Sequence, residues 1–325
     1  MVSVIMPTAN RPKLLKVAIA SVLNQTGGHL IKEIIVSENG QNRDSQAVCE
    51  SFGDARIKYE YLDPAQPHPA RSMNLYGQAS ADYVATLHDD DWWFPGYLQR
   101  AYDSLKTYGT EAFFCDWNFY TSETICEYSS AKNYALWFGS GFPAVTAPWN
   151  LSPKQLALGS LPCTPIHLST GLWKRETLNR CFTLLTEFYN PYDCDRLVAA
   201  EIARYGGITF SPEPLVCIRH HQQQDGKRFS EAMREPYVTG TTKHVIALCN
   251  HMGVDIRKEI DELIRQCPPA VLLPCMRNFH PFVIAELERQ NLIGPKFSEW
   301  LAWDKKRKFN KRVARWIPPV ITEKI

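Results

Sequence analysis

The stretch VSVIMPTANRPKLLKVAIASVLNQTGGHLIKEIIVSENG, residues 2–40, decides the fold. It opens with a short β-rich run that Pro7 ends, and Pro12 then suits the first turn of a helix. Apolar residues recur at helical spacing between 13 and 25, and a second strand-like run follows at 32–40. A strand, a helix and a strand in this order predict a parallel sheet with helices on its faces.

The same alternation continues along the chain and then changes. We expect further strands at 57–62, 82–88, 111–120 and 208–218, and helices near 70–78, 95–109 and 196–205. Residues 129–165 are rich in Pro, Gly, Ser and aromatics, which indicates long loops over a cleft. After about residue 228 we expect helices separated by prolines, at 230–252, 255–266, 278–290 and 296–315. The prediction is an α/β domain over 1–228 and a helical region over 229–325.

Composition excludes several classes. The 325 residues are 45% hydrophobic and 22% charged, as in folded globular proteins, and a net charge of +2 argues against a protein built to hold nucleic acid. The ten cysteines form no CxxC pair, so we expect reduced and mostly buried thiols. The first residues are typical of a buried strand rather than a signal peptide, and no apolar run is long enough to span a bilayer. We therefore expect a cytoplasmic location.

Three consecutive aspartates follow the predicted strand 82–88, in the sequence HDDDWW, residues 88–93. Adjacent carboxylates repel, so a bound divalent cation is expected to offset their charge. In an open parallel sheet, ligands bind at the carboxyl ends of the strands, where PTANR and SENG also lie. A diphosphate suits such a cation, and Arg71 is placed to contact a phosphate. The alternatives are ordinary loop and cap residues, and a solvated Arg71.

Three stretches in order, VSVIMPTANRPKLLKVAIASVLNQT, EIIVSENG and ARSMNLYGQASADYVATLHDDDWWFP, together resemble a family 2 glycosyltransferase of the GT-A, nucleotide-diphospho-sugar transferase fold. The resemblance covers roughly residues 2–225. It implies a nucleotide-sugar-binding half over 1–120, and an acceptor side with the catalytic base over 121–228.

The resemblance also implies the residues that bind the donor. Pro7, Thr8 and Arg11 would line the nucleotide pocket, with Asp89 as a further pocket or sugar contact. Glu38 stands at the position that usually contacts the base. The family's usual Asp-Asp-Gly-Ser is here ENGQ, which leaves the base open.

The metal motif of the family is altered in this chain. Registered on Pro95, its D-x-D falls on residues 88–90, so Asp90 keeps the metal-binding position and His88 replaces the first aspartate. His221 matches a histidine that approaches the metal or the diphosphate; its alternative is a loop histidine. Histidine suits Mn²⁺ better than Mg²⁺, so Mn²⁺ is the expected cofactor and Mg²⁺ the alternative. Asp91 is expected to support or cap the motif.

The base of inverting family members comes from a Glu-Asp pair that opens a helix, and the matching stretch is NPYDCDRLVAAEIARYGG, residues 190–207. Counting back from Gly206, Asp195 takes the base position and Cys194 replaces the glutamate. Asp193 is the rival base, and either aspartate also suits a helix N-cap. In the segment 162–176, the side chains of His167, Ser169 and Thr170 are candidates for binding sugar hydroxyls.

The C-terminal segment 296–316 combines apolar residues, three of them tryptophans, with seven Lys and Arg between 305 and 315. Such a helix suits the surface of an anionic membrane, at the inner face of the cell membrane. A solvated helix packed on the domain is the alternative. RNA binding is less favoured, because no nucleic-acid motif accompanies the segment.

These features predict a metal-dependent inverting glycosyltransferase. It would move a sugar from a nucleotide-diphosphate donor, most simply a UDP-sugar, to a glycan or lipid-linked glycan acceptor in bacterial surface polysaccharide or glycolipid synthesis. Because both motifs are altered, a non-catalytic sugar-nucleotide-binding or scaffold module is the alternative. A nucleotidyltransferase is disfavoured because PTANRPK lacks glycines, and a dehydrogenase because no GxGxxG follows the first strand.

Overall fold

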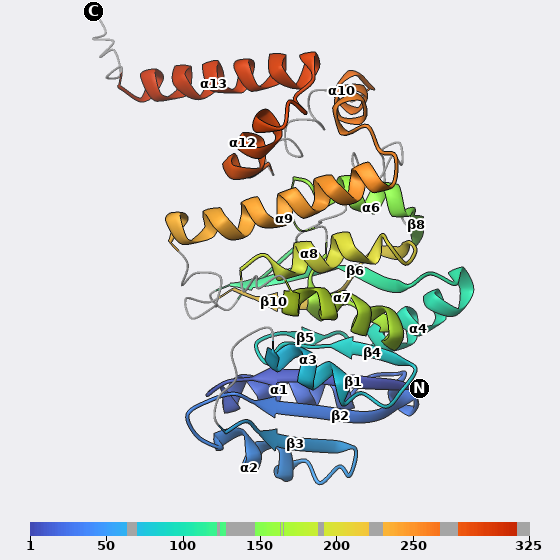
Figure 1. The fold of residues 1–325 in the computed structure, drawn as a ribbon. Helices are drawn as coiled ribbons and strands as arrows, with labels where there is room; N and C mark the ends of the chain where they lie inside the picture. The colour runs from blue at the N-terminus through green and yellow to red at the C-terminus, as the bar shows by residue number, and fades with distance from the viewer. Residues whose placement is uncertain are drawn as a thin grey trace, which may run out of the picture.

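The computed structural model has one mixed β-sheet at its centre (Figure 1). The structure describes residues 1–63, 70–121, 124–127, 147–162, 164, 166–187, 192–220, 230–266 and 279–316. Within these residues the strand order is β3-β2-β1-β4-β9-β6-β10-β5, with β7 paired to β6 and β8 to β10. The strands are β1 (Val2–Thr8), β2 (Ile31–Glu38), β3 (Ile57–Tyr61), β4 (Tyr83–Thr86), β5 (Trp92–Trp93), β6 (Ala112–Thr121), β7 (Thr124–Glu127), β8 (Trp149–Leu151), β9 (Leu172–Lys174) and β10 (Ile208–Arg219).

The order of the strands reverses between β1 and β4. β1 pairs in parallel with β2 on one side and with β4 on the other, and the chain reaches β2 and β3 before it crosses to β4. β9 runs antiparallel to both β4 and β6, and β6 runs parallel to β10. The residues before β9 therefore lie at the same edge as the ends of β1, β4 and β10. We call this edge the carboxyl edge, and the opposite one the amino edge.

Helices cover both faces of the sheet, because successive strand residues point to opposite sides. Val4 belongs to the core under α1 (Pro12–Leu23), α2 (Asp44–Ser51) and α4 (Tyr97–Tyr108). Ile5 belongs to the other core, which includes residues of α3 (Ala70–Gly77), α6 (Pro153–Gly159), α7 (Arg175–Glu187) and α8 (Cys194–Ile202). The predicted α/β class with a largely parallel sheet is confirmed.

The predicted C-terminal helices form and extend the second core. They are α9 (Glu231–His251), α10 (Ile256–Gln266), α12 (Pro281–Arg289) and α13 (Pro295–Trp316), and in Figure 1 they lie above α8. α9 packs on α6, α8 and α12, while α10 packs on α13. The buried Arg196 of α8 donates hydrogen bonds to the Val238 carbonyl at 2.9 Å and to Thr242 Oγ1 at 3.1 Å. The predicted boundary near 228 falls outside the described residues.

The prediction of loops throughout 129–165 is wrong at its end, where β8 and α6 form. The Ser152 side chain caps α6 by accepting a hydrogen bond from the Gln155 backbone N–H, and the Gln155 side chain accepts one from the Ser152 backbone N–H. Pro153 occupies the first turn. This capping box is a sequence signal for a helix start. The rest of the range at 129–146, and residues 163 and 165, lie outside the described residues.

The remaining expectations concern the cysteines, membrane-spanning helices and the C-terminal helix. Six described cysteines are free, and five of them are buried: Cys49, Cys115, Cys181, Cys217 and Cys249. None of the helices in the described residues is both long and apolar enough to cross a bilayer. In α13, Trp300 packs against the core and Trp303 is exposed; the side chains after residue 306 are not described.

Candidate active site at the carboxyl edge

The acidic cluster sits where the strand order reverses, which is the position at which open α/β sheets bind ligands. Thr8 ends β1, and Asp89 follows β4. Thr8 Oγ1 donates a hydrogen bond to Asp89 Oδ2 at 2.8 Å, so the two strand ends are joined directly. The register places Thr8 opposite Glu38 at the end of β2.

Arg11 offsets the charge of the first two site carboxylates. Its Nη1 lies 3.1 Å from Asp89 Oδ1 and 3.3 Å from Asp90 Oδ2. Asp89 is only 4% exposed. Burial and the neighbouring Asp90 raise the pKa of the Asp89 carboxyl, whereas Arg11 and Thr8 act against that rise. Arg11 therefore compensates the two charges only in part.

Asp91 is held by a different set of partners. Ser169 Oγ donates to its Oδ2 at 2.6 Å, and the Arg219 backbone N–H donates to its Oδ1 at 3.1 Å. Burial, followed by the charge of Asp90, raises the pKa of Asp91 to about 7 in spite of these bonds and the nearby His88. The third aspartate of the cluster is thus a buried carboxyl whose ionised form lacks full compensation.

Ser169 links the segment before β9 to the acidic loop, which is the stretch 87–91 between β4 and β5. Besides donating to Asp91, its Oγ accepts a hydrogen bond from the His88 backbone N–H at 3.2 Å, and its carbonyl accepts one from the Trp93 indole at 2.8 Å. The Thr170 hydroxyl donates to the His167 carbonyl at 2.7 Å. Both hydroxyls are buried and bonded within the protein, and their predicted contact with sugar stays a prediction.

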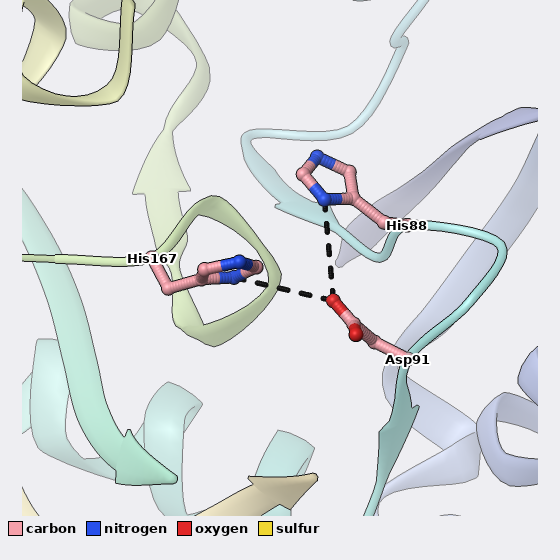
Figure 2. A group of neighbouring side chains, drawn as sticks. All are labelled: His88, Asp91 and His167. Atoms are coloured by element: carbon pink, nitrogen blue, oxygen red, sulfur yellow. Dashed lines mark ion pairs between the residues drawn. The ribbon is translucent and has the colours of Figure 1, made fainter. Parts of the chain in front are cut away.

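Two histidines, whose ring centres lie 5.5 Å apart, both face the same oxygen of Asp91 (Figure 2). His88 Nδ1 lies 3.9 Å, and His167 Nδ1 4.0 Å, from Asp91 Oδ2. Burial lowers the pKa of His167 to about 4, with His88 acting in the same direction and the charges of Asp195 and Asp90 against it. His167 is therefore neutral at pH 7 and carries a lone pair. The influence of Asp195 and Asp90 also shows that both carboxylates are near this ring.

Arg219 is fixed in place at the end of β10. Its Nε donates to the Asp90 carbonyl at 3.1 Å. Its guanidinium carbon lies 5.1 Å from the centre of the Trp92 ring and 4.9 Å from that of the Tyr120 ring, which are cation–π distances. Trp93 is buried and stacks on Tyr97, so it packs into the core.

A hydrogen bond joins the segments that follow β1 and β2. Asn10, in the left-handed region at φ 56°, accepts the Gln41 backbone N–H at 2.9 Å through its side chain. A Cβ at Gly40 would lie 2.4 Å from Asn10 Oδ1, so a larger residue there would have to displace the Asn10 side chain. Glu38 is fully buried and accepts hydrogen bonds from the Ser45 hydroxyl at 2.8 Å and the Tyr59 hydroxyl at 2.7 Å. Its contact with a base stays a prediction.

The two candidate bases differ in their surroundings. Asp193 is 9% exposed and its Oδ2 lies 2.6 Å from Nη2 of Arg196, whose side chain is buried. Asp195, in the first turn of α8, is half-buried, and accepts a 3.2 Å contact from the Cys194 thiol. Only Asp195 therefore combines partial exposure with a position near His167 and the acidic loop.

The remaining predicted residues are placed only in part. Pro7 is half-buried and lies opposite Ser37 in the β1–β2 register. Arg71 is in α3, but its side chain is outside the described residues, as is all of His221. The close association of His167 with Asp91 was not foreseen, because no local pattern links residues so distant in sequence.

The mixed sheet with helices on both faces and the strand reversal beside the aspartates agree with the α/β GT-A fold expected from the sequence. Residues 3–146 match the model described as "Glycosyl transferase family 2". The match places this part of the chain in that family, and the resemblance inferred from its motifs is confirmed.

Two curated relatives are bacterial proteins whose names refer to an undecaprenol-linked glycan and to teichoic acid. The chain is 40% identical over 92 residues to the "GalNAc(5)-diNAcBac-PP-undecaprenol beta-1,3-glucosyltransferase" of Campylobacter jejuni, over 27% of this chain and 29% of the relative. It is 31% identical over 121 residues to "Minor teichoic acid biosynthesis protein GgaA" of Bacillus subtilis, over 36% of this chain and 25% of the relative. The matched segments thus span less than a third of either relative.

A solved structure shares the fold along most of the chain. Residues 1–349 of S. aureus TarS in complex with UDP-GlcNAc superpose with a TM-score of 0.57, covering 89% of this chain and 92% of that one. The sequences are 13% identical over this superposition, so the likeness shows the fold alone.

Proposed function

We propose that this protein is an inverting glycosyltransferase that moves a sugar from a nucleotide-diphosphate donor to an acceptor hydroxyl. The observation that carries the proposal is the group formed by Thr8, Arg11 and the three aspartates at the strand reversal, with the half-buried Asp195 close by. The family match supports the reaction class. A UDP-sugar is the proposed donor, because the TarS structure of the same fold holds UDP-GlcNAc.

Donor binding is assigned to the residues around β1 and β4. Pro7, Thr8 and Arg11 would line the nucleotide pocket, with Asp89 beside them. Arg11 supplies a positive charge next to the carboxylates, and a donor diphosphate would compete with them for its guanidinium. Arg71 is proposed as a further phosphate contact.

A divalent cation fits the donor atoms at this edge. Asp90 offers a carboxylate with 12% of its side chain exposed, and His88 offers an imidazole that is 33% exposed. These residues, with His221, are the proposed ligands of Mn²⁺ or, less favourably, Mg²⁺. When bound, the cation would offset the negative charge that develops on the diphosphate leaving group.

Asp195 is the proposed general base. It would take the proton of the acceptor hydroxyl while the hydroxyl oxygen attacks the anomeric carbon. The bond from that carbon to the diphosphate oxygen breaks, its electron pair leaves with the diphosphate, and the configuration inverts. Asp193 is less suited, because its carboxylate already neutralises the buried Arg196.

The proposed acceptor is a glycan or a lipid-linked glycan of a bacterial cell surface. This proposal is supported by the names of the two curated relatives, which refer to an undecaprenol-linked glycan and to teichoic acid biosynthesis. Attachment of the basic α13 to the inner face of the cell membrane would bring the enzyme to a lipid-linked acceptor. A cytoplasmic, peripheral location belongs to this same proposal.

The test is release of the nucleoside diphosphate from a panel of UDP-, GDP- and TDP-sugars, with Mn²⁺, with Mg²⁺ and with a chelator. We expect release from a UDP-sugar that depends on Mn²⁺ and is lost in Asp90→Asn. The exposed Glu259→Gln, which removes the same charge far from the site, is the control and should match the wild type. Donor binding without release from any sugar would favour the scaffold alternative instead.

A further inference from the structure

His88 and Asp91 come from the loop between β4 and β5, His167 comes from the segment before β9, and the three side chains converge on one point (Figure 2). His88 follows β4, Asp91 precedes β5, and His167 precedes the short helix η2 (Leu168–Thr170). One nitrogen or oxygen atom from each residue lies within 4.8 Å of the others. Two imidazoles and one carboxylate are therefore gathered around a common centre.

We propose that His88, Asp91 and His167 bind a divalent transition-metal ion, and that they do so in the absence of nucleotide. Two imidazole nitrogens with one carboxylate oxygen suit ions such as Mn²⁺, Co²⁺ and Zn²⁺. Mg²⁺ prefers oxygen ligands and retains its waters, so the same three groups discriminate against it. The site stands on these side chains alone and does not rest on the proposed transfer reaction.

The carboxylate of the trio is already oriented. Asp91 Oδ1 accepts the backbone N–H of Arg219, and Oδ2, the oxygen that faces both histidines, accepts the hydroxyl of Ser169. Such bonds from surrounding groups fix the ligands of metal sites and tune their strength. Ser169 and Arg219 therefore act as positioning residues for Asp91.

The histidine nitrogens are available to a metal. His167 Nδ1 accepts a 3.3 Å hydrogen bond from the Ser169 backbone N–H, which places its lone pair on the side of Asp91. A metal bound at Nδ1 would displace this bond, so metal binding has to outweigh the loss of the acceptor of the buried Ser169 N–H. The side chains of His88 and His167 are 33% and 27% exposed, which leaves room for water or a substrate oxygen as further ligands.

A small movement of the two histidine rings would bring all three ligand atoms within bonding distance of one metal ion. A metal at about 2.0–2.2 Å from each ligand brings the ligand atoms to roughly 3 Å of one another. From 3.9 Å and 4.0 Å, each ring needs to approach Asp91 by about 1 Å. Rotation of two partly exposed side chains achieves this while Asp91 stays in place. In the nucleotide-free protein, His88 would thus hold this metal with Asp91 and His167, whereas in the proposed donor complex it would join Asp90.

The test is titration of the nucleotide-free protein with Co²⁺, read by its visible absorption, and with Mn²⁺, read by paramagnetic resonance. We expect one Co²⁺ per chain, with the Kd raised at least about 10-fold in His167→Ala and in His88→Ala. His251→Ala, which removes an exposed histidine of α9, is the matched control and should bind as the wild type does. Millimolar Mg²⁺ should not displace the ion.

Three results would overturn the inference. They are no saturable Co²⁺ binding, binding that His167→Ala leaves unchanged, and displacement by Mg²⁺ at equal concentration. In those cases the trio is a structural contact between the acidic loop and the segment before β9. Asp90→Asn separates this inference from the proposed function, since it should abolish donor turnover yet leave nucleotide-free Co²⁺ binding intact.

Discussion

The two edges of the sheet differ in how completely the charge of their buried carboxylates is compensated by the protein. At the amino edge, Glu33 is 1% exposed and accepts hydrogen bonds from Ser3 Oγ at 2.6 Å, Ser80 Oγ at 2.6 Å and Lys58 Nζ at 2.5 Å. Burial acts to raise its pKa, but these partners together outweigh burial and lower the pKa to about 2. The ionised form of Glu33 is thus fully compensated by the protein itself.

At the carboxyl edge the compensation is incomplete. Asp89 and Asp90 share the guanidinium of Arg11, whereas Asp91 accepts hydrogen bonds from the Ser169 hydroxyl and the Arg219 backbone N–H. The pKa values of Asp89 and Asp91 are nevertheless raised. Residues with pKa values perturbed in this direction gather at sites that bind or transform a ligand. We infer that the carboxylate at the amino edge stabilises the fold, whereas the incompletely compensated carboxylates at the carboxyl edge serve to bind a ligand.

The largest expected effect concerns the base at the carboxyl edge. Asp195→Asn should lower the transfer rate at least about 100-fold, because the acceptor hydroxyl loses its proton acceptor. The melting temperature should stay near that of the wild type, since Asp195 is half-buried. Both quantities are measured on the same preparation.

Asp193→Asn is the matched comparison. It leaves the buried Arg196 without its ion-pair partner, so we expect a loss of about 3 kcal/mol in the free energy of unfolding. If instead Asp193→Asn is inactive at normal stability while Asp195→Asn transfers sugar, the base is Asp193.

The next largest effect is a pH-dependent loss of stability when the carboxylate at the amino edge is removed. Glu33→Gln should lower the free energy of unfolding at pH 7 by on the order of 2 kcal/mol and leave donor binding unchanged. Because the pKa of Glu33 is lowered from 4.5 to about 2, the stability it contributes is present above pH 4.5. That stability is lost as the pH falls toward 2.

Urea unfolding at pH 7 and at pH 3 measures this prediction. The gap between wild type and Glu33→Gln should shrink at the lower pH, whereas Glu259→Gln, an exposed carboxylate, should differ little from the wild type at either. A gap that widens toward pH 3 would contradict the assigned role of Glu33.

The smallest effect compares one hydroxyl at each edge. Thr8→Val removes the donor to Asp89, and Ser3→Ala removes a donor to Glu33. Each should cost about 1 kcal/mol in stability. Only Thr8→Val should also weaken donor binding, by several-fold in Kd, as measured by calorimetry. Equal effects of the two changes on donor Kd would remove the functional distinction between the edges.

Local pattern predicted most of the fold. The strand–helix–strand start appears as β1, α1 and β2, and the four C-terminal helices form near the expected bounds. Three helices, α2, α6 and α7, have no counterpart among the predicted elements. In α7, Leu178, Cys181 and Phe182 recur at helical spacing and are buried. β9 has three residues, too few for a pattern, and forms because β4 and β6 flank it.

The candidate site was predicted only where it is local in sequence. The acidic loop, with Asp89 and Asp90, was found from its own residues. The pairing of Asp91 with Ser169 joins positions 78 residues apart, and the crossing of β9 between β4 and β6 produces it. The burial of Arg196 could not be predicted from the sequence either, because an arginine in a helix is ordinarily solvated.

The most direct measurement is calorimetric titration of a UDP-sugar, with Mn²⁺ present, into the wild type, Asp90→Asn and Glu33→Gln. The account predicts saturable binding to the wild type and to Glu33→Gln with similar Kd values, and binding to Asp90→Asn that is at least about 10-fold weaker. Equal binding to all three proteins, or binding lost only in Glu33→Gln, would contradict the assignment of the carboxyl edge as the donor site.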